Sequence, residues 1–263
     1  MSYTETNAHV ITFRKGMLEV RIFSDREDMG REAARNVSDT IQELLKNRDE
    51  INMIFAAAPS QSDFMKELIA DERIKWNRIN AFHMDEYIGL EQEAPQGFGN
   101  FLRDRIFGKV PFKSVHYING LAGDPAAECE RYAGLLSNYP VDIVCLGIGE
   151  NGHIAFNDPP VADFDDPMLV KVVELEVACR QQQVNEELFD TLEQVPTHAV
   201  TVTIPALLKA SHMFCMVPAR NKAEAVYHTL NDEISEKCPA TILRTKKGTI
   251  LYIDEESASL LNQ

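Results

Sequence analysis

The stretch "VDIVCLGIGENGHIAFNDP", residues 141–159, joins a run of apolar residues to a glycine-rich turn. A short and almost wholly apolar run is typical of a strand that is covered on both faces, as in a parallel sheet. Gly147, Gly149 and Gly152 allow the backbone to turn tightly where this strand ends, and His153 follows them. The segment therefore predicts a buried strand that leads into a functional loop.

Similar apolar runs alternate with stretches of helical periodicity along the whole chain, as Met29, Ala33, Val37 and Ile41 show for residues 25–47. This alternation predicts an α/β fold, a Rossmann-like and mostly parallel sheet with helices on both faces, in a single domain over residues 1–263. We expect strands at 18–23, 51–58, 78–84, 114–118, 141–148, 168–175, 198–204, 212–218 and 249–253. Helices are expected at 25–47, 98–107, 124–139, 180–192, 204–210 and 219–230.

Composition limits the class of protein. The formal net charge is −15 and no cluster of basic residues occurs, which argues against a nucleic-acid partner. The five cysteines are widely spaced without a CxxC pair, as in a reduced cytoplasmic protein. There is no signal peptide and no apolar stretch of membrane-spanning length, so we expect a cytoplasmic protein without a membrane partner.

Polar residues gather just after the predicted strands, where ligands bind in parallel α/β sheets. His153, flanked by Asn151 and Asp158, is suited to proton transfer near neutral pH. The alternative is a structural histidine that is hydrogen-bonded within a turn. A dinucleotide loop is disfavoured because two prolines follow the turn, and a nucleophile elbow because residues 146–159 contain no Ser or Cys.

Two other loops contain candidate residues. Of the adjacent Asp85 and Glu86, one could serve as a general base while the other faces solvent or a helix N-terminus. "AAAPSQSDF", residues 56–64, could bind an anion through backbone N–H groups, Ser60, Gln61 and Ser62, or be an ordinary helix start capped by Ser or Asp. Lys222 or Arg220 could neutralise a phosphate. No metal-binding motif occurs. These residues predict a proton-transfer enzyme with a small anionic substrate.

"HMDEYIGL", residues 83–90, together with "LGIGENGHIAFNDP", residues 146–159, resembles the glucosamine-6-phosphate deaminase family, whose fold is shared by 6-phosphogluconolactonases. The resemblance covers essentially the whole chain and implies proton transfer by Asp85 and ring opening by His153, without a cofactor. It assigns the remaining catalytic positions to Asn151 and Asp158. It assigns sugar-phosphate contacts to Gly147 and Lys222, with Arg180 as a shifted candidate. The other candidates for these contacts are Ser60, Gln61, Glu86 and Gly152.

This chain also departs from the family pattern. Asn151 and Asp158 replace the usual Asp and Glu, "APSQSD" replaces a glycine- and threonine-rich phosphate loop, and Arg180 is shifted from the usual arginine. The expected substrate is glucosamine 6-phosphate. The alternatives are galactosamine 6-phosphate or another sugar phosphate, a lactonase reaction, and a non-catalytic sugar-phosphate sensor. The oligomeric state is open, with a homo-oligomer among the alternatives.

Overall fold

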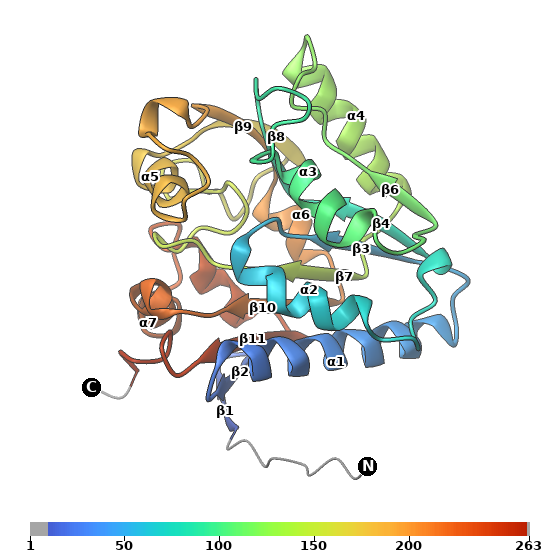
Figure 1. The fold of residues 1–263 in the computed structure, drawn as a ribbon. Coiled ribbons are helices and arrows are strands. Elements are labelled where there is room, and N and C mark those ends of the chain that lie inside the picture. The colour runs from blue at the N-terminus through green and yellow to red at the C-terminus, as the bar shows by residue number, and fades with distance from the viewer. Residues whose placement is uncertain (1–9, 262–263) are drawn as a thin grey trace.

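A computed structural model describes residues 10–261 (Figure 1). Its main sheet has the strand order β1-β2-β11-β10-β7-β3-β4-β6. Within the described residues β1 pairs antiparallel with β2, and all other neighbours in this sheet are parallel. The strands are β1 (Ile11–Lys15), β2 (Leu18–Phe23), β3 (Ile51–Phe55), β4 (Ile79–His83), β6 (Ser114–His116), β7 (Ile143–Leu146), β10 (His212–Val217) and β11 (Thr249–Asp254). The predicted mostly parallel α/β fold is confirmed.

A second, smaller sheet has the strand order β5-β9-β8 and is antiparallel. Its strands are β5 (Asp85–Tyr87), β8 (Val170–Glu174) and β9 (His198–Val202). The sequence predicts residues 168–175 and 198–204 as strands of a single sheet, which is wrong, and it does not predict β5. The incomplete burial of β8 shows why: Lys171 is only half-buried and Val172 and Glu174 are exposed, and a strand partly open to solvent suits an antiparallel sheet.

The helices cover both faces of the main sheet (Figure 1). They are α1 (Arg26–Leu45), α2 (Ser62–Ile69), α3 (Phe98–Leu102), α4 (Pro125–Asn138), α5 (Val177–Asn185), α6 (Ile204–Leu208) and α7 (Ala223–Asn231). The helix predicted at 98–107 changes at Arg103 into a π-helical turn, and the helix predicted at 180–192 lies several residues earlier, as α5.

Burial on both faces follows from the apolar runs in the strands. In β3, Phe55 packs in a cluster with α1 and α2, whereas its neighbour Ile54 belongs to a cluster on the other face with α4, α6 and α7. In β7, Cys145 and Val144 divide in the same way. Successive side chains of a strand point to opposite faces, so a run without polar residues fits only a strand covered twice.

The order of the strands creates a crevice at one place on the sheet edge. After β3 the chain adds β4 and β6 on one side, then returns to place β7, β10 and β11 on the other. The loops that follow β3 and β7 therefore leave the sheet in opposite directions. Such a switch point is where open α/β sheets bind ligands, and the glycine-rich turn after β7 lies there.

Candidate active site

A small cavity opens at this switch point. The loops after β3, β4 and β7 line it together with α5 and the start of α7. Of the residues predicted from the sequence, five line this cavity: Ser60, Asp85, Gly147, His153 and Lys222. Its volume of about 70 Å³ is far below the roughly 300–1,000 Å³ of sites that hold small molecules. The arrangement is thus a closed one.

His153 lies against the backbone of the turn that precedes it. A Cβ atom at Gly149 would overlap with the imidazole ring, so only glycine leaves room for the ring there. The backbone N–H of Gly149 also donates to the carbonyl of His153, at 3.0 Å. This contact holds the ring at the cavity. A larger residue at position 149 would push it out.

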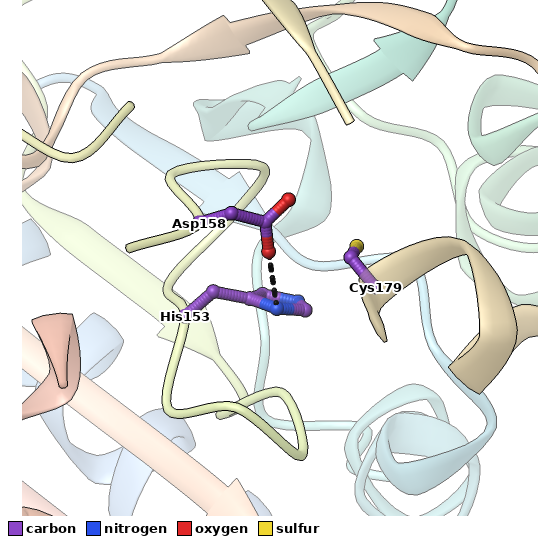
Figure 2. A group of neighbouring side chains, drawn as sticks. All are labelled: His153, Asp158 and Cys179. Carbon is purple, nitrogen blue, oxygen red and sulfur yellow. Dashed lines mark ion pairs between the residues drawn. The ribbon is translucent and has the colours of Figure 1, made fainter. Parts of the chain in front are cut away.

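Asn151 and Asp158 hold one nitrogen of this ring. Nδ1 of His153 lies 2.7 Å from Oδ1 of Asn151 and 3.0 Å from Oδ1 of Asp158, and Figure 2 shows the latter pair. The Asn151 oxygen also accepts the backbone N–H of His153, at 3.1 Å. Nδ1 therefore faces two oxygen acceptors. Nε2 has no hydrogen bond within residues 10–261, which leaves it available to a substrate.

The amide group of Asn151 bridges two carboxylates. Its Nδ2 donates to Oδ1 of Asp158 at 3.0 Å and to Oε2 of Glu176 at 2.8 Å. An aspartate at this position would instead place a third carboxylate beside the other two. Glu176 comes just before α5 and is not among the residues predicted from the sequence. It explains physically why an amide suits position 151 in this chain.

The surroundings of Asp158 stabilise its charged form. Burial by itself raises the pKa of this carboxyl group, but the charge of His153 and the hydrogen bonds from His153, Asn151 and the Glu176 N–H outweigh burial. The pKa is therefore lowered. Asp158 is a buried carboxylate that stays ionised and orients the imidazole. The contact with His153 is made although Asp is one methylene shorter than Glu.

Asp85 is in the opposite situation. Its carboxyl group takes part in none of the hydrogen bonds found in the described part of the chain, and its side chain is buried at the cavity. Burial, and next the charge of Glu86, raise its pKa well above the ordinary value. Such a carboxyl group binds a proton strongly, as a group that takes a proton from carbon must.

His83 fixes the backbone on which Asp85 lies. Its Nε2 accepts the N–H of Ile118 at 2.9 Å, so Nδ1 carries the hydrogen and donates to the carbonyl of Asp85, also at 2.9 Å. Burial lowers the pKa of His83 to about 4. The ring is thus a neutral structural support that fixes the start of β5.

Glu86 points away from the cavity, as alternation along β5 requires. Its carboxylate accepts backbone N–H groups from Tyr87, Phe98 and Gly99 at 2.7 to 3.0 Å, and so caps the N-terminus of α3. It lines a separate cavity of about 320 Å³, which Asp85 does not reach. The prediction that one of the two acids meets a helix N-terminus is confirmed. In this structure the carboxylate of Glu86 binds the start of α3 and lies outside the cavity of Asp85, and its contact with a substrate stays a prediction.

The loop after β3 forms a 3₁₀ turn, Pro59–Gln61, that leads into α2. Ser60 lines the cavity, whereas Gln61 is buried and donates its amide to the carbonyl of Met216 at 3.1 Å. No side chain caps α2, so the expected Ser or Asp cap is wrong; Asp63 instead pairs with Arg26. Gln61 thus supports the cavity wall without lining it.

Lys222 comes from a strained turn after β10. Ala219 has φ +80°, a value that residues other than glycine rarely adopt, and its N–H donates to both oxygens of the Asp254 carboxylate, at 3.1 and 3.0 Å. This anchor directs Lys222 into the cavity, where its side chain is 6% exposed. Arg220 is exposed and does not line the cavity. Of the two cations predicted here, the structure brings Lys222 to the site.

Two further predicted residues lie outside the cavity. The guanidinium of Arg180 donates to the carbonyls of Leu192 and Val195 at 2.6 to 3.2 Å, so it holds the segment after α5. Gly152 has φ +83° and packs against Cys238, where a side chain would collide with the sulfur. Neither residue contacts the cavity in this closed arrangement.

Sequence reasoning missed the contribution of α5. Gln182, Gln183 and Glu186 line the cavity, although they lie far along the chain from the loops after β3 and β7. The signal that could have found them is the pair of glutamines, because both are buried on a short helix where apolar residues are expected. Buried polar side chains need partners, and Gln182 finds them in the N–H of Glu150 and the carboxylate of Glu186.

Cys179 from α5 completes a cluster with His153 and Asp158 (Figure 2). One ligand atom of each lies within 4.8 Å of the others, the kind of grouping that can hold a metal ion. The donor set suits a metal poorly, because burial and the neighbouring carboxylates raise the pKa of the Cys179 thiol well above its usual value. A protonated thiol is a weak ligand, and both oxygens of Asp158 already accept hydrogen bonds. That no metal is used stays a prediction.

Comparisons with known proteins agree with this geometry. Residues 24–252 match the family model for glucosamine-6-phosphate isomerases/6-phosphogluconolactonase. Glucosamine-6-phosphate deaminases of Bacillus cereus and Bacillus thuringiensis are 35% identical over 223 residues, which is 85% of this chain and 83% of theirs.

Solved structures give the same result. A monomeric glucosamine-6-phosphate deaminase has a TM-score of 0.83 and 31% identity, over 92% of this chain and 99% of that one. A 6-phosphogluconolactonase from Thermotoga maritima shares the fold at a TM-score of 0.72 and 21% identity, over 89% of this chain and 98% of that one. With the cavity at the sheet's switch point and a family match over most of its length, the chain belongs to the glucosamine-6-phosphate isomerase/6-phosphogluconolactonase family.

Proposed function

We propose that this protein is an amino-sugar phosphate isomerase and deaminase that converts glucosamine 6-phosphate and water to fructose 6-phosphate and ammonia. The observation that carries the proposal is the pair of acid–base groups at one cavity, His153 and Asp85. Relatives named glucosamine-6-phosphate deaminase support the choice of substrate.

His153 would open the sugar ring. Because Asn151 and Asp158 hold Nδ1, Nε2 is the nitrogen that faces a bound sugar. It can take the proton from the anomeric hydroxyl and deliver a proton to the ring oxygen as the C1–O bond breaks. Asp158 stabilises the imidazolium that exists between these two transfers.

Asp85 would then isomerise the open chain. Its carboxylate removes the proton from C2 and returns it to C1, while a proton passes from the amine nitrogen to O1. The aldehyde thereby becomes a hydroxyl group at C1, and the neighbouring amine becomes an imine at C2. Water adds to this imine and ammonia leaves, which gives the ketose. Each step moves a proton beside a carbonyl or an imine, and the raised pKa of Asp85 suits a group that takes a proton from carbon.

The other reactions weighed from the sequence make different demands on these residues. A lactonase would need His153 to activate water but would have no use for Asp85. A sensor would need neither group to exchange protons. The position of Asp85 at the cavity, buried and without a hydrogen-bond partner for its carboxyl group in the described residues, favours the isomerase over both.

The cellular location and the domain organisation of the chain are part of the proposal. We infer a cytoplasmic location and a single domain over residues 1–263, and all five cysteines are buried as free thiols, as in proteins kept reduced. Within residues 10–261 no helix combines the length and apolar character needed to cross a bilayer.

The test is to incubate the purified protein with glucosamine 6-phosphate and, separately, galactosamine 6-phosphate, and to measure ammonia and ketose phosphate in the same samples. We expect equal amounts of both products from the gluco substrate. Substituting His153→Gln should lower kcat by about 10²–10⁴-fold. The matched control is His228→Gln, because His228 is exposed on α7 and should leave kcat unchanged.

The outcomes separate the alternatives. Ammonia from galactosamine 6-phosphate alone would reassign the substrate, and hydrolysis of 6-phosphogluconolactone without ammonia release from either amine would replace the deaminase with a lactonase. If no substrate turns over but sugar phosphates bind, the protein is a sensor.

A further inference from the structure

The cation that faces the cavity already has a partner. Nζ of Lys222 lies 3.4 Å from Oε1 of Glu186, and the two side chains are 6% and 17% exposed. Glu186 is the one acidic residue within ion-pair distance of Lys222 in residues 10–261. Both side chains line the cavity that also contains Asp85 and His153.

Glu186 is held in this position from its own helix. Oε1 accepts a hydrogen bond from Nε2 of Gln182, at 2.7 Å, one helical turn earlier. Oε1 of Gln182 in turn accepts the backbone N–H of Glu150, at 2.9 Å, from the loop after β7. The carboxylate is therefore oriented toward Lys222 by contacts to two elements and does not depend on the ion pair alone.

A phosphate group and this carboxylate need the same ammonium group. Two anions around one buried cation repel each other strongly, because little water remains to screen them. Among residues 10–261 no other Lys or Arg lines the cavity: Arg180 is bound to carbonyl groups, and Arg220 lies outside it. A phosphate can approach Lys222 only when Glu186 moves away.

We propose that Glu186 occupies the anion position at Lys222 in the free protein and competes with the phosphate group of the substrate, which makes it a residue that sets the affinity of the phosphate site. The inference rests on the proposed function, because it concerns the phosphate end of the same substrate. Glu186 neutralises Lys222 while the site is empty. It also lowers the affinity for any phosphorylated ligand by the free energy needed to displace it.

The test measures binding and not turnover. Inorganic phosphate and fructose 6-phosphate are titrated calorimetrically into the wild type, Glu186→Gln and Glu187→Gln. Glutamine at 186 keeps a side-chain oxygen for Gln182 but carries no charge, so we expect Kd for both ligands to fall about ten-fold. Glu187→Gln is the matched control, because it removes the same charge from the next residue, which is exposed and outside the cavity, and should stay within two-fold of wild type.

Lys222→Met gives a second, independent arm. If Glu186 acts through Lys222, adding Glu186→Gln to Lys222→Met should no longer strengthen phosphate binding. The inference is overturned if Glu186→Gln leaves Kd unchanged or raises it, if Glu187→Gln has the same effect, or if phosphate binds to none of these proteins.

This outcome is separate from that of the proposed function. A ten-fold lower Kd in Glu186→Gln without ammonia release by the wild type would remove the deaminase and keep the competition. Ammonia release by the wild type, together with an unchanged Kd in Glu186→Gln, would keep the deaminase and remove the competition.

Discussion

Asp85 and Asp158 are two buried aspartates at one site, and their surroundings treat them in opposite ways. Asp158 receives hydrogen bonds from Asn151 and from the N–H of Glu176, beside the imidazole of His153, and its pKa is lowered. Asp85 has no such partners in the described residues, and its pKa is raised. Both are nearly inaccessible to solvent, at 5% and 0% exposed, so burial alone does not decide the difference.

The comparison teaches how one site can suit two aspartate side chains to different roles. A carboxyl group that is hydrogen-bonded on every side can orient a neighbour and hold a charge, but it cannot readily take a proton. One that is left without partners is a stronger base and a less stable ion. Environments that separate two pKa values in this way assign the acid–base roles.

The largest expected effect is the loss of kcat on substitution of Asp85, whose carboxyl group has no hydrogen-bond partner in the described residues. Asp85→Asn keeps the shape of the side chain but cannot accept a proton, and we expect kcat for ammonia release to fall by about 10²–10⁴-fold. Steady-state assays at saturating substrate measure this. Turnover within about five-fold of wild type would show that Asp85 is not the base.

The buried His83, which supports the backbone at Asp85, should make the free energy of unfolding depend on pH. Because burial keeps His83 neutral down to a pKa of about 4, against about 6.5 when unfolded, the unfolded chain binds a proton that the folded one does not. The free energy of unfolding should therefore fall by about 3 kcal/mol as the pH falls from 6.5 to 4. Urea unfolding of wild type and His83→Gln across this range measures it, and equal slopes in the two proteins would contradict it.

Replacing each aspartate by asparagine should change the free energy of unfolding at pH 7 in opposite directions. A lowered pKa contributes stability above the unfolded value, so Asp158→Asn should reduce the free energy of unfolding by about 1–3 kcal/mol. A raised pKa costs stability once the pH exceeds the unfolded value, so Asp85→Asn should raise the free energy of unfolding. Changes of the same sign in both variants would contradict the comparison.

The smallest expected effect concerns the amide between the carboxylates. Asn151→Asp would bring a third negative charge beside Asp158 and Glu176, and we expect a loss of about 1 kcal/mol in the free energy of unfolding. Adding Glu176→Gln should restore the lost free energy of unfolding, because the side chain at position 176 then supplies the amide group. Thermal unfolding of the single and double variants tests this, and a loss that the second substitution does not reverse would refute the explanation.

The sequence predicts the elements whose signal is local. The apolar run of β7 and the glycines after it place His153 correctly, because a strand buried on both faces and a tight turn each have a clear pattern. The second sheet was missed since Asp85–Tyr87 is short and two of its three residues are acidic, which indicates a loop. Gln182 and Glu186 were missed for another reason. The contact of Glu186 with Lys222, and that of Gln182 with the loop after β7, depend on how α5 packs over the crevice, which no spacing within the helix encodes.

The size of the cavity has a kinetic consequence. A space of about 70 Å³ is smaller than a hexose phosphate needs, so we expect residues that line it to move before such a ligand binds. Association then becomes a two-step process in which opening comes first, and the observed rate of binding levels off at the opening rate however concentrated the ligand is. In a protein built in this way, the rate of that opening limits how fast the substrate enters.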